Sequence, residues 1–301
     1  MATVVVALGG NTLLRGGEGS IAEQREQVDR AANRLAPLRE RGDDLVVTHG
    51  NGPQVGDLLL QQEGAEHPRP LDVLVAETQA QIGYLLAQAL APRLDGAAAA
   101  VVTQSVVDPD DPAFDDPSKP VGPYYSAEEA ESKAFETTAV TRPDGSTAHR
   151  RVVPSPEPTA VVESERIASL VGDGRPVVCA GGGGVPVVRE DDDLRGVPAV
   201  IDKDHTARVL GDALGADELL FLTDVDCTYL NFGESDQRPI HAASVDEMRR
   251  HLDAGEFGEG SMRPKVEAAV RFVADGGERA VITSPERLPA ALDGEAGTRI
   301  T

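Results

Sequence analysis

Short apolar runs alternate with helical patterns along most of this chain of 301 residues. The runs are rich in valine, isoleucine and leucine, and they predict strands over residues 3–8, 44–48, 99–105, 176–180, 218–223 and 279–284. Strands that are apolar at nearly every position are typical of a parallel sheet with helices on both faces. The pattern therefore predicts an α/β protein with a mostly parallel sheet, in which ligands bind beyond the carboxyl ends of the strands.

The first helix has clear boundaries in the sequence. Ser20 and Glu23 form a capping box, in which each side chain is expected to accept a hydrogen bond from the other residue's backbone N–H. Gly42 is expected to end this helix, because glycine readily adopts the left-handed backbone conformation. The helix lies between the first two predicted strands, as the alternating pattern requires.

Residues 107–158 interrupt the alternation. Prolines recur there, helical patterns weaken, and residues 142–145 (Arg-Pro-Asp-Gly) predict a turn between two short strands. We interpret residues 1–301 as one domain in which residues 107–158 form an inserted, protruding lid subdomain. The alternative is a surface excursion without a role in the site, and Lys119 within the segment favours the lid.

Charge restricts the partners of the protein. Asp and Glu total 51 against 28 Lys and Arg, which gives a formal net charge of -23. A chain this acidic is not expected to bind nucleic acid or an anionic membrane. The carboxylates are interpreted as a solvated surface of the halophilic type, for which the urea midpoint of unfolding should rise between low and molar KCl.

The sequence also indicates where the protein resides and whether it binds a metal. No apolar run reaches the length of a membrane-spanning helix, and no basic leader precedes the first predicted strand, so we expect a cytoplasmic protein. Cys179 and Cys227 lack the CxxC spacing of a metal or redox site and are interpreted as reduced core residues. The aspartates at 191–193 are interpreted as a solvated loop, so no metal site made by the protein alone is predicted.

Lysine is rare, and its positions carry chemical information. The chain has only four lysines, of which Lys133 lies in an ordinary charged stretch. Lys119, Lys203 and Lys265 lie instead in motifs rich in glycine, proline or aspartate. A compact ammonium group on a flexible stem, next to accessible backbone, is well suited to binding phosphate. These three lysines are therefore candidate phosphate ligands.

Glycine-rich loops follow three of the predicted strands. Glycine allows backbone N–H groups to surround an oxyanion, and a helix that follows adds its positive end. Any one of these loops could be only a tight turn between a strand and a helix. Three such loops at equivalent strand ends favour substrate and phosphate binding by Gly9, Gly10, Gly50, Asn51, Gly52, Gly181, Gly182 and Gly183.

Two common nucleotide-binding fingerprints are missing from the sequence. GxxxxGK[ST] does not occur, and the loop from Gly50 to Gly56 has one residue too many for GxGxxG. Asp72 is near the distance at which a dinucleotide-binding protein carries its acidic ribose ligand, but it lies in a helical pattern. A dinucleotide-binding dehydrogenase is therefore disfavoured.

Eight segments of the chain resemble, in order, those of the carbamate kinases, a branch of the amino-acid kinase superfamily. They are residues 7–11, 48–56, 111–122, 150–156, 181–187, 199–204, 222–226 and 260–265. Together with their flanks they cover the chain from Val4 to Thr298 without a missing block. The resemblance implies an open αβα sandwich with a protruding subdomain, a homodimer, and ATP or ADP with Mg²⁺. It also implies reversible phosphoryl transfer between ATP and carbamate, giving carbamoyl phosphate, run toward ATP in arginine breakdown.

The resemblance also implies roles for particular residues. Two lysines would hold the transferring phosphoryl group, an aspartate would orient them, and a third lysine would join them from the lid. The catalytic residues implied are Lys203, Asp204, Lys265, Lys119 and Asn11. The nucleotide-binding residues implied are Thr223, Asp224, Tyr229 and Met262, although residues 222–229 could also be only a buried strand followed by a polar turn.

The implied reaction explains why the sequence shows no Ser/His/Asp arrangement. Carbamate is an anion at neutral pH, so its oxygen can attack phosphorus without a general base, and catalysis must come from positioned positive charge. His49 is therefore interpreted as a loop-packing residue rather than an acid or base, and Asp202 as a helix N-cap. Two alternatives stay open: another acyl-phosphate-forming amino-acid kinase, or a nucleotide sensor of the same fold without catalytic activity.

Overall fold

The core of the protein is an eight-stranded sheet in the order β15-β17-β16-β12-β1-β2-β9-β3. The structure, a computed structural model, describes residues 2–9, 20–94, 96–142, 144–191, 193–258 and 260–301. Adjacent strands are parallel throughout this sheet except that β17 runs antiparallel to β16. The strands are β1 (Thr3–Leu8), β2 (Asp44–His49), β3 (Ala99–Ala100), β9 (Val177–Val178), β12 (Glu218–Leu222), β15 (Ala242–Ala243), β16 (Arg279–Thr283) and β17 (Thr298–Ile300).

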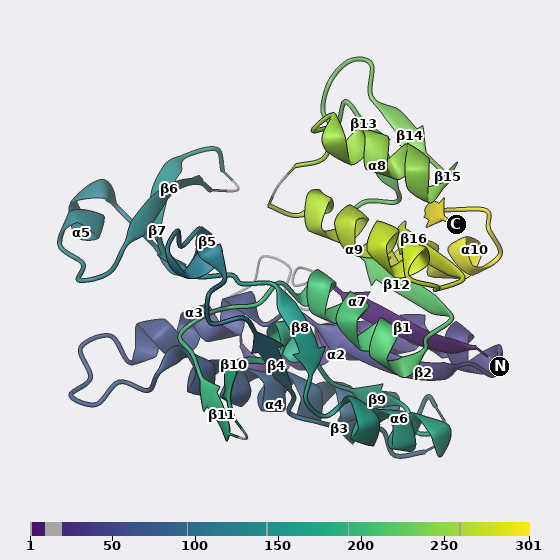
Figure 1. Ribbon diagram of the computed structural model, residues 1–301, viewed down its shortest axis with the longest axis horizontal. Helices are drawn as coiled ribbons and strands as arrows, with labels where there is room; N and C mark the ends of the chain where they lie inside the picture. The colour runs from purple at the N-terminus through teal and green to yellow at the C-terminus, as the bar shows by residue number, and fades with distance from the viewer. Residues whose placement is uncertain (1, 10–19, 95, 143, 192, 259) are drawn as a thin grey trace.

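Helices cover both faces of the sheet, as the apolar strands predict (Figure 1). Along β1 the side chains alternate between two separate cores: Val5 and Ala7 belong to one, and Val4, Val6 and Leu8 to the other. The first core includes residues of α6 (Ser164–Gly172), α7 (Lys203–Leu214), α8 (Val245–Asp253) and α9 (Met262–Ala274). The second includes residues of α2 (Ile21–Glu40), α4 (Leu71–Leu90) and α10 (Leu288–Leu292). The predicted α/β sandwich is confirmed.

A second sheet extends the structure beside the first. It contains four strands in the order β11-β10-β4-β8, namely β11 (Asp193–Gly196), β10 (Val185–Glu190), β4 (Gln104–Val107) and β8 (Pro158–Val161). The prediction of one strand over residues 99–105 is therefore wrong: this segment begins as β3 in the main sheet and continues as β4 in the second. Between them, Thr103 N and Oγ1 both donate to Gln79 Oε1, at 2.8 and 2.6 Å, which holds the chain where it changes sheet.

Residues 119–153 form a third sheet, which protrudes from the body in Figure 1. Its strands are β5 (Lys119–Tyr125), β6 (Thr137–Thr141) and β7 (Thr147–Val153), in the order β5-β7-β6, and α5 (Ala127–Glu131) lies between β5 and β6. Gly145 has a φ of +83°, and its N–H donates to Arg142 O, so the predicted turn joins β6 to β7. At its root, Val121 and Val153 pack with Val55 of α3 (Gly52–Gln61).

The remaining elements are short. A two-stranded hairpin of β13 (Thr228–Leu230) and β14 (Arg238–Ile240) rises above the main sheet, and the 3₁₀ turns are η1 (Pro112–Phe114), η2 (Gly181–Gly183) and η3 (Pro285–Arg287). The capping box at Ser20 and Glu23 is confirmed, and Gly42, with a φ of +82°, follows the end of α2. Within the described residues, no helix is long and apolar enough to cross a membrane.

Candidate active site

A cavity of about 380 Å³ opens at the carboxyl ends of β1 and β12, where the fold class predicts a ligand site. It contains every described residue that was predicted to be catalytic or to bind nucleotide: Lys119, Lys203, Asp204, Lys265, Thr223, Asp224, Tyr229 and Met262. Gly9 also lines it, whereas Gly10 and Asn11 lie outside the described residues. The structure thus brings together residues from near the two ends of the chain, from Gly9 to Lys265.

One carboxylate lies between two lysines at the base of the cavity. Asp204 Oδ2 accepts hydrogen bonds from Lys203 Nζ at 3.1 Å and from Lys265 Nζ at 2.9 Å. Lys265 Nζ donates also to the Ser261 carbonyl at 3.0 Å. The Asp204 side chain is only 3% exposed, so both ammonium groups are held by a buried, fixed anion. This is the geometry expected of charges positioned before the substrate binds.

Two helices begin at the same cavity. Lys203 is the first residue of α7 and Met262 the first of α9, and the positive ends of both helix dipoles therefore lie at its wall. Asp202 caps α7, since its Oδ1 accepts from Asp204 N at 2.9 Å, which confirms the predicted N-cap. Ser261, at the start of α9, makes no side-chain cap bond. Helix N-termini of this kind favour phosphate.

The two buried lysines have opposite pKa shifts. Burial acts to lower the pKa of Lys203, but the attraction of Asp204 and Asp202 outweighs it, and the pKa lies above its ordinary value. Burial lowers the pKa of Lys265, and the attraction of Asp204 only partly offsets this effect. The nearby charge of Lys203 lowers the pKa of Lys265 further. Both ammonium groups line the cavity, so an anionic ligand bound there would stabilise the charged form of both lysines.

Lys119 enters the cavity from the protruding sheet. It is the first residue of β5, and its Nζ lies 2.8 Å from Oδ2 of Asp202. Burial acts to raise the pKa of Asp202, yet the charges of Lys119 and Lys203 hold that pKa well below its usual range. The third lysine is therefore already paired with the carboxylate that caps α7, across the junction between the protruding sheet and the body. The closing motion of this lobe stays a prediction.

The glycines of η2 have a packing role in the structure. A Cβ atom on Gly181 would lie 2.4 Å from the His49 ring, and one on Gly182 would lie 2.2 Å from the Asn51 amide. Gly182 also has a φ of +64°. The loops after β2 and β9 therefore interlock, with side chains from one filling the space left by glycine in the other. Gly50, Asn51, Gly52 and Gly181–Gly183, all described, do not line the cavity, and their contact with substrate stays a prediction.

His49 is buried within this interlock. Its ring is 0% exposed and its Nδ1 lies 3.0 Å from Gly50 O, so Nδ1 carries the proton and donates to that carbonyl. Burial lowers the pKa of His49 to about 4 despite the Gly50 hydrogen bond, so the ring is neutral near pH 7. Its Nε2 is buried without a hydrogen-bond partner. The neutral ring and the unpartnered Nε2 both support the interpretation that His49 packs the loop.

The neutral state of His49 predicts acid sensitivity of the fold. Between the unfolded pKa of about 6.5 and the folded value of about 4, the unfolded chain binds the extra proton, so stability is complete above that window and is lost as the pH falls through it. Between pH 7 and pH 4.5, the free energy of unfolding of the native chain should fall by about 2 kcal/mol more than that of His49→Asn, which lacks this titration. Urea unfolding at both pH values measures the difference. His67→Asn, at a side chain that is 91% exposed, is the control, and parallel profiles for all three proteins would contradict the prediction.

The structure adds cavity residues that the sequence did not single out. Val225, Phe232, Glu256, Phe257 and Gly258 line the cavity on the side of the β13–β14 hairpin. The aromatic residues could have been a signal, because the chain has only six phenylalanines and four tyrosines, and three of these ten side chains line this one cavity. Tyr229 in β13 was already implied by the resemblance, whereas Phe232 and Phe257 lie outside the strands and helices, where no periodicity marks them.

The fold and the site agree with comparisons to known proteins. The sequence pattern of the Amino acid kinase family matches residues 2–284, so the chain belongs to that family and is a phosphotransferase. A carbamate kinase of Halobacterium salinarum is 56% identical to it, covering 100% of this chain and 98% of the relative. A carbamate kinase of Thermococcus kodakarensis is 46% identical over 100% of this chain and 99% of the relative.

A solved structure gives the same assignment. The carbamate kinase from Giardia lamblia bound to AMP-PNP superposes with a TM-score of 0.90 at 38% identity, over 99% of this chain and 98% of the other. Within the amino acid kinase family, the chain therefore groups with the carbamate kinases. The predicted family and fold are confirmed.

Proposed function

We propose that this protein catalyses reversible phosphoryl transfer between ADP and carbamoyl phosphate, giving ATP and carbamate. The observation that carries the proposal is the pair of lysines fixed by Asp204 at the start of α7 and α9, inside an otherwise acidic protein. Two anionic substrates have to meet there, and the main obstacle is their mutual repulsion. Fixed ammonium groups and helix N-termini reduce that repulsion without any proton transfer.

The reaction needs no acid or base from the protein. An oxygen of the ADP β-phosphate attacks the phosphorus of carbamoyl phosphate, and the bond from phosphorus to the carbamoyl oxygen breaks. The electron pair of that bond stays on the oxygen, and carbamate leaves as an anion. Lys203 and Lys265 would contact the transferring group from two sides, and Lys119 would contact it from the protruding sheet. Asp204 would act as a positioning residue for the first two.

Magnesium would accompany the nucleotide. The cavity is lined by the carboxylates of Asp202, Asp204 and Asp224, and oxygen is the donor that Mg²⁺ prefers, so the residues fit such an ion bound mainly by phosphate. When bound, it would supply further positive charge to the phosphate oxygens. Asp204 is bonded to two lysines and Asp202 to Lys119, so the phosphates of the nucleotide would supply most of the ligands of the ion.

Two further features complete the proposal. Residues 107–158 would act as the lid, with Lys119 as its contribution to the site, and Thr223, Asp224, Tyr229 and Met262 would bind the nucleotide.

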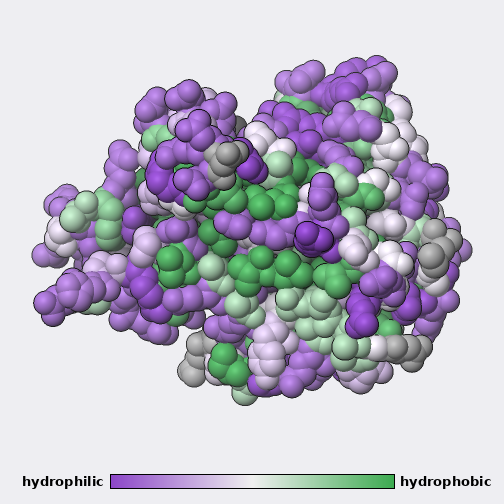
Figure 2. Space-filling view, turned by 60° about the horizontal axis from the view of Figure 1, so that its bottom comes forward, coloured by the Kyte–Doolittle hydropathy of each residue, from purple (hydrophilic) through white to green (hydrophobic). Residues whose placement is uncertain are grey.

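A homodimer would use the side of the molecule that carries α4 and β3, where Figure 2 shows a band of apolar surface. Val73 and Tyr84 on α4 and Val102 after β3 are exposed large apolar residues, with exposed fractions of 38%, 52% and 44%. Light scattering of the purified protein measures the oligomeric state directly.

Coupled ATP formation from ADP and carbamoyl phosphate tests the function. We expect turnover with this pair. We expect none with ATP and acetylglutamate or aspartate, the substrates that would indicate another acyl-phosphate-forming amino-acid kinase. The assay is run in KCl from low to molar concentration, since the acidic surface predicts a requirement for salt. A protein that binds ADP but shows no exchange between ATP and ADP in the presence of carbamoyl phosphate would be a sensor, and the proposal would be wrong.

A further inference from the structure

Three arginines of the protruding sheet have aromatic rather than acidic neighbours. Arg142 and Arg150 lie over one ring, that of Tyr124, with their guanidinium carbons 5.0 and 5.3 Å from its centroid. Arg151 lies 5.0 Å from the ring centroid of Phe135. Among the residues that the structure describes, none of these arginines forms an ion pair, although the chain contains 51 Asp and Glu. In so acidic a protein, this absence calls for a physical explanation.

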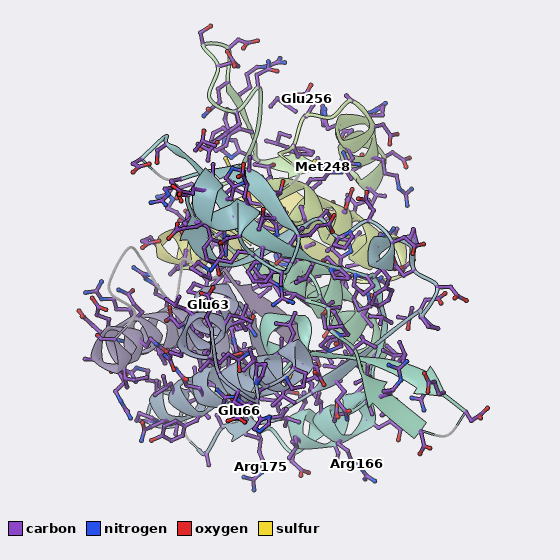
Figure 3. All side chains as sticks on the ribbon, turned by 90° about the vertical axis from the view of Figure 1, so that its left-hand side faces the viewer. Glu63, Glu66, Arg166, Arg175, Met248 and Glu256 are labelled. Atoms are coloured by element: carbon purple, nitrogen blue, oxygen red, sulfur yellow. The ribbon has the colours of Figure 1, made fainter. Side chains whose placement is uncertain are left out.

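The two lysines of the same sheet and its connections are paired with carboxylates. Lys119 Nζ lies 2.8 Å from Oδ2 of Asp202. Lys133 pairs with Glu63, in the connection between α3 and α4, on the side of the molecule that faces the viewer in Figure 3. Partly buried cations are normally compensated in this way. Acidic side chains of the body can therefore reach the protruding sheet, and the arginines nevertheless have none.

Arg150 is held in place by the protein itself. Its Nε donates to the Gly122 carbonyl at 3.0 Å, and its guanidinium lies over the Tyr124 ring. Its terminal amino groups donate to no acceptor in the described part of the chain. Burial lowers the pKa of Arg150 below its ordinary value, because no carboxylate offsets the loss of hydration. The result is a fixed, partly desolvated fork of N–H donors without a protein acceptor.

Arg142 places a second guanidinium on the same ring. Its Nε is buried without a hydrogen-bond partner. The acidic groups that act on it at longer range, Glu129 and Asp144, accept hydrogen bonds from Ser126 N and Ser146 N. A buried polar group without a protein partner indicates a bond to water or to an ion. A guanidinium group also matches a carboxylate or phosphate with two parallel N–H bonds and stacks on aromatic faces at the same time.

We propose that Arg142, Arg150 and Tyr124 form a binding site for a small oxyanion, a carboxylate or a phosphate, on the protruding sheet. The Tyr124 ring is 42% exposed, so a ligand can approach its edge from solvent. None of the three residues lines the cavity between β1 and β12, so the site is separate from the candidate active site. Arg150 supplies the fixed fork and Arg142 the second positive charge. The proposal does not depend on the reaction proposed above.

Tyrosine resonances test this site specifically, because the chain has only four tyrosines and no tryptophan. Protein with ¹³C-labelled tyrosine is titrated separately with inorganic phosphate and with acetate at constant KCl, and Tyr124→Phe assigns the Tyr124 signal. That signal should shift saturably. Arg150→Gln and Arg142→Gln should each raise the Kd at least about tenfold, the scale of losing one charge-assisted hydrogen bond. Arg195→Gln, in an exposed pair with Glu190, is the control and should leave the Kd unchanged.

Two other tyrosines separate the possible outcomes. Tyr125 belongs to the same strand, so its unchanged signal in Arg150→Gln shows that the sheet remains folded, and Arg142→Gln decides if that signal changes. Tyr229 lines the cavity, and a Tyr124 shift with the same midpoint as a Tyr229 shift would overturn the proposal, because it would report binding in the cavity. A Tyr124 signal unmoved by both anions, or a Kd unaffected by both substitutions, would also overturn it. A response to one anion alone would support the site and identify its ligand.

Discussion

Replacing Lys203 or Lys265 with alanine should lower kcat by about 10² or more, the scale of losing one preorganised donor at a site of developing charge. Each ammonium group is fixed by Asp204, at 3.1 and 2.9 Å, so neither pays to become ordered as the transition state forms. The same substitution should have a smaller effect on the KM for ADP, because the base and ribose are proposed to bind elsewhere in the cavity. Steady-state kinetics in both directions measures the two quantities.

Both variants are expected to remain folded. Asp204 keeps one lysine partner in either case, and an ammonium group in the first turn of α7 opposes the helix dipole, so its removal does not weaken that helix. Lys133→Ala is the control: it removes the one lysine that lies away from the cavity and pairs with Glu63, and its kcat should match the native value. If Lys203→Ala or Lys265→Ala retained near-native kcat with intact circular dichroism, that lysine would have no part in the mechanism.

Much of the main sheet was predictable because burial on both faces leaves a plain signal. β1, β2, β12 and β16 lie within one residue of their predicted bounds, and each is buried at nearly every position. The segment 99–105 shows where this reasoning fails. An apolar run says that the chain is buried, but it does not say in which sheet, and Thr103 bonded to Gln79 divides this run between two. Three of the four strands of the second sheet, β4, β8 and β11, have only 4 residues each, which is too few for a pattern.

The site was predictable from lysine because the chain uses lysine so sparingly. The motifs identified lysines whose aspartate partners are distant in the sequence. Lys119 is 83 residues from Asp202, and Lys265 is 61 residues from Asp204. Phe232 and Phe257 of the cavity were not predicted, since both lie outside the strands and helices, where the sequence shows no periodicity. The glycines of η2 were interpreted as an anion cradle from their spacing. Only the structure shows the close contacts with His49 and Asn51 that also require glycine there.

The second large effect is expected at Lys119. Its ammonium group pairs with Asp202 across the junction between β5 and α7, at 2.8 Å, and its side chain is 33% exposed, against 7% for Lys265. Charge at this position would therefore reach the phosphates from the lobe, whereas the residues proposed to bind the nucleotide after β12 belong to the body. Lys119→Ala should lower kcat by roughly ten- to a hundredfold while leaving the Kd for ADP alone nearly unchanged.

Calorimetric titration with ADP and steady-state turnover, measured on the same preparation, give the comparison. Lys133→Ala is again the matched control, because it removes a lysine from the same lobe that pairs with Glu63 rather than with a cavity residue. Asp202→Asn complements it: the N-cap acceptor is kept, the pairing of Lys119 is weakened, and turnover should fall less than in Lys119→Ala. If Lys119→Ala lost ADP binding as severely as turnover, β5 would be a permanent wall of the nucleotide pocket. The lobe would then not be a lid that acts on the transferred group.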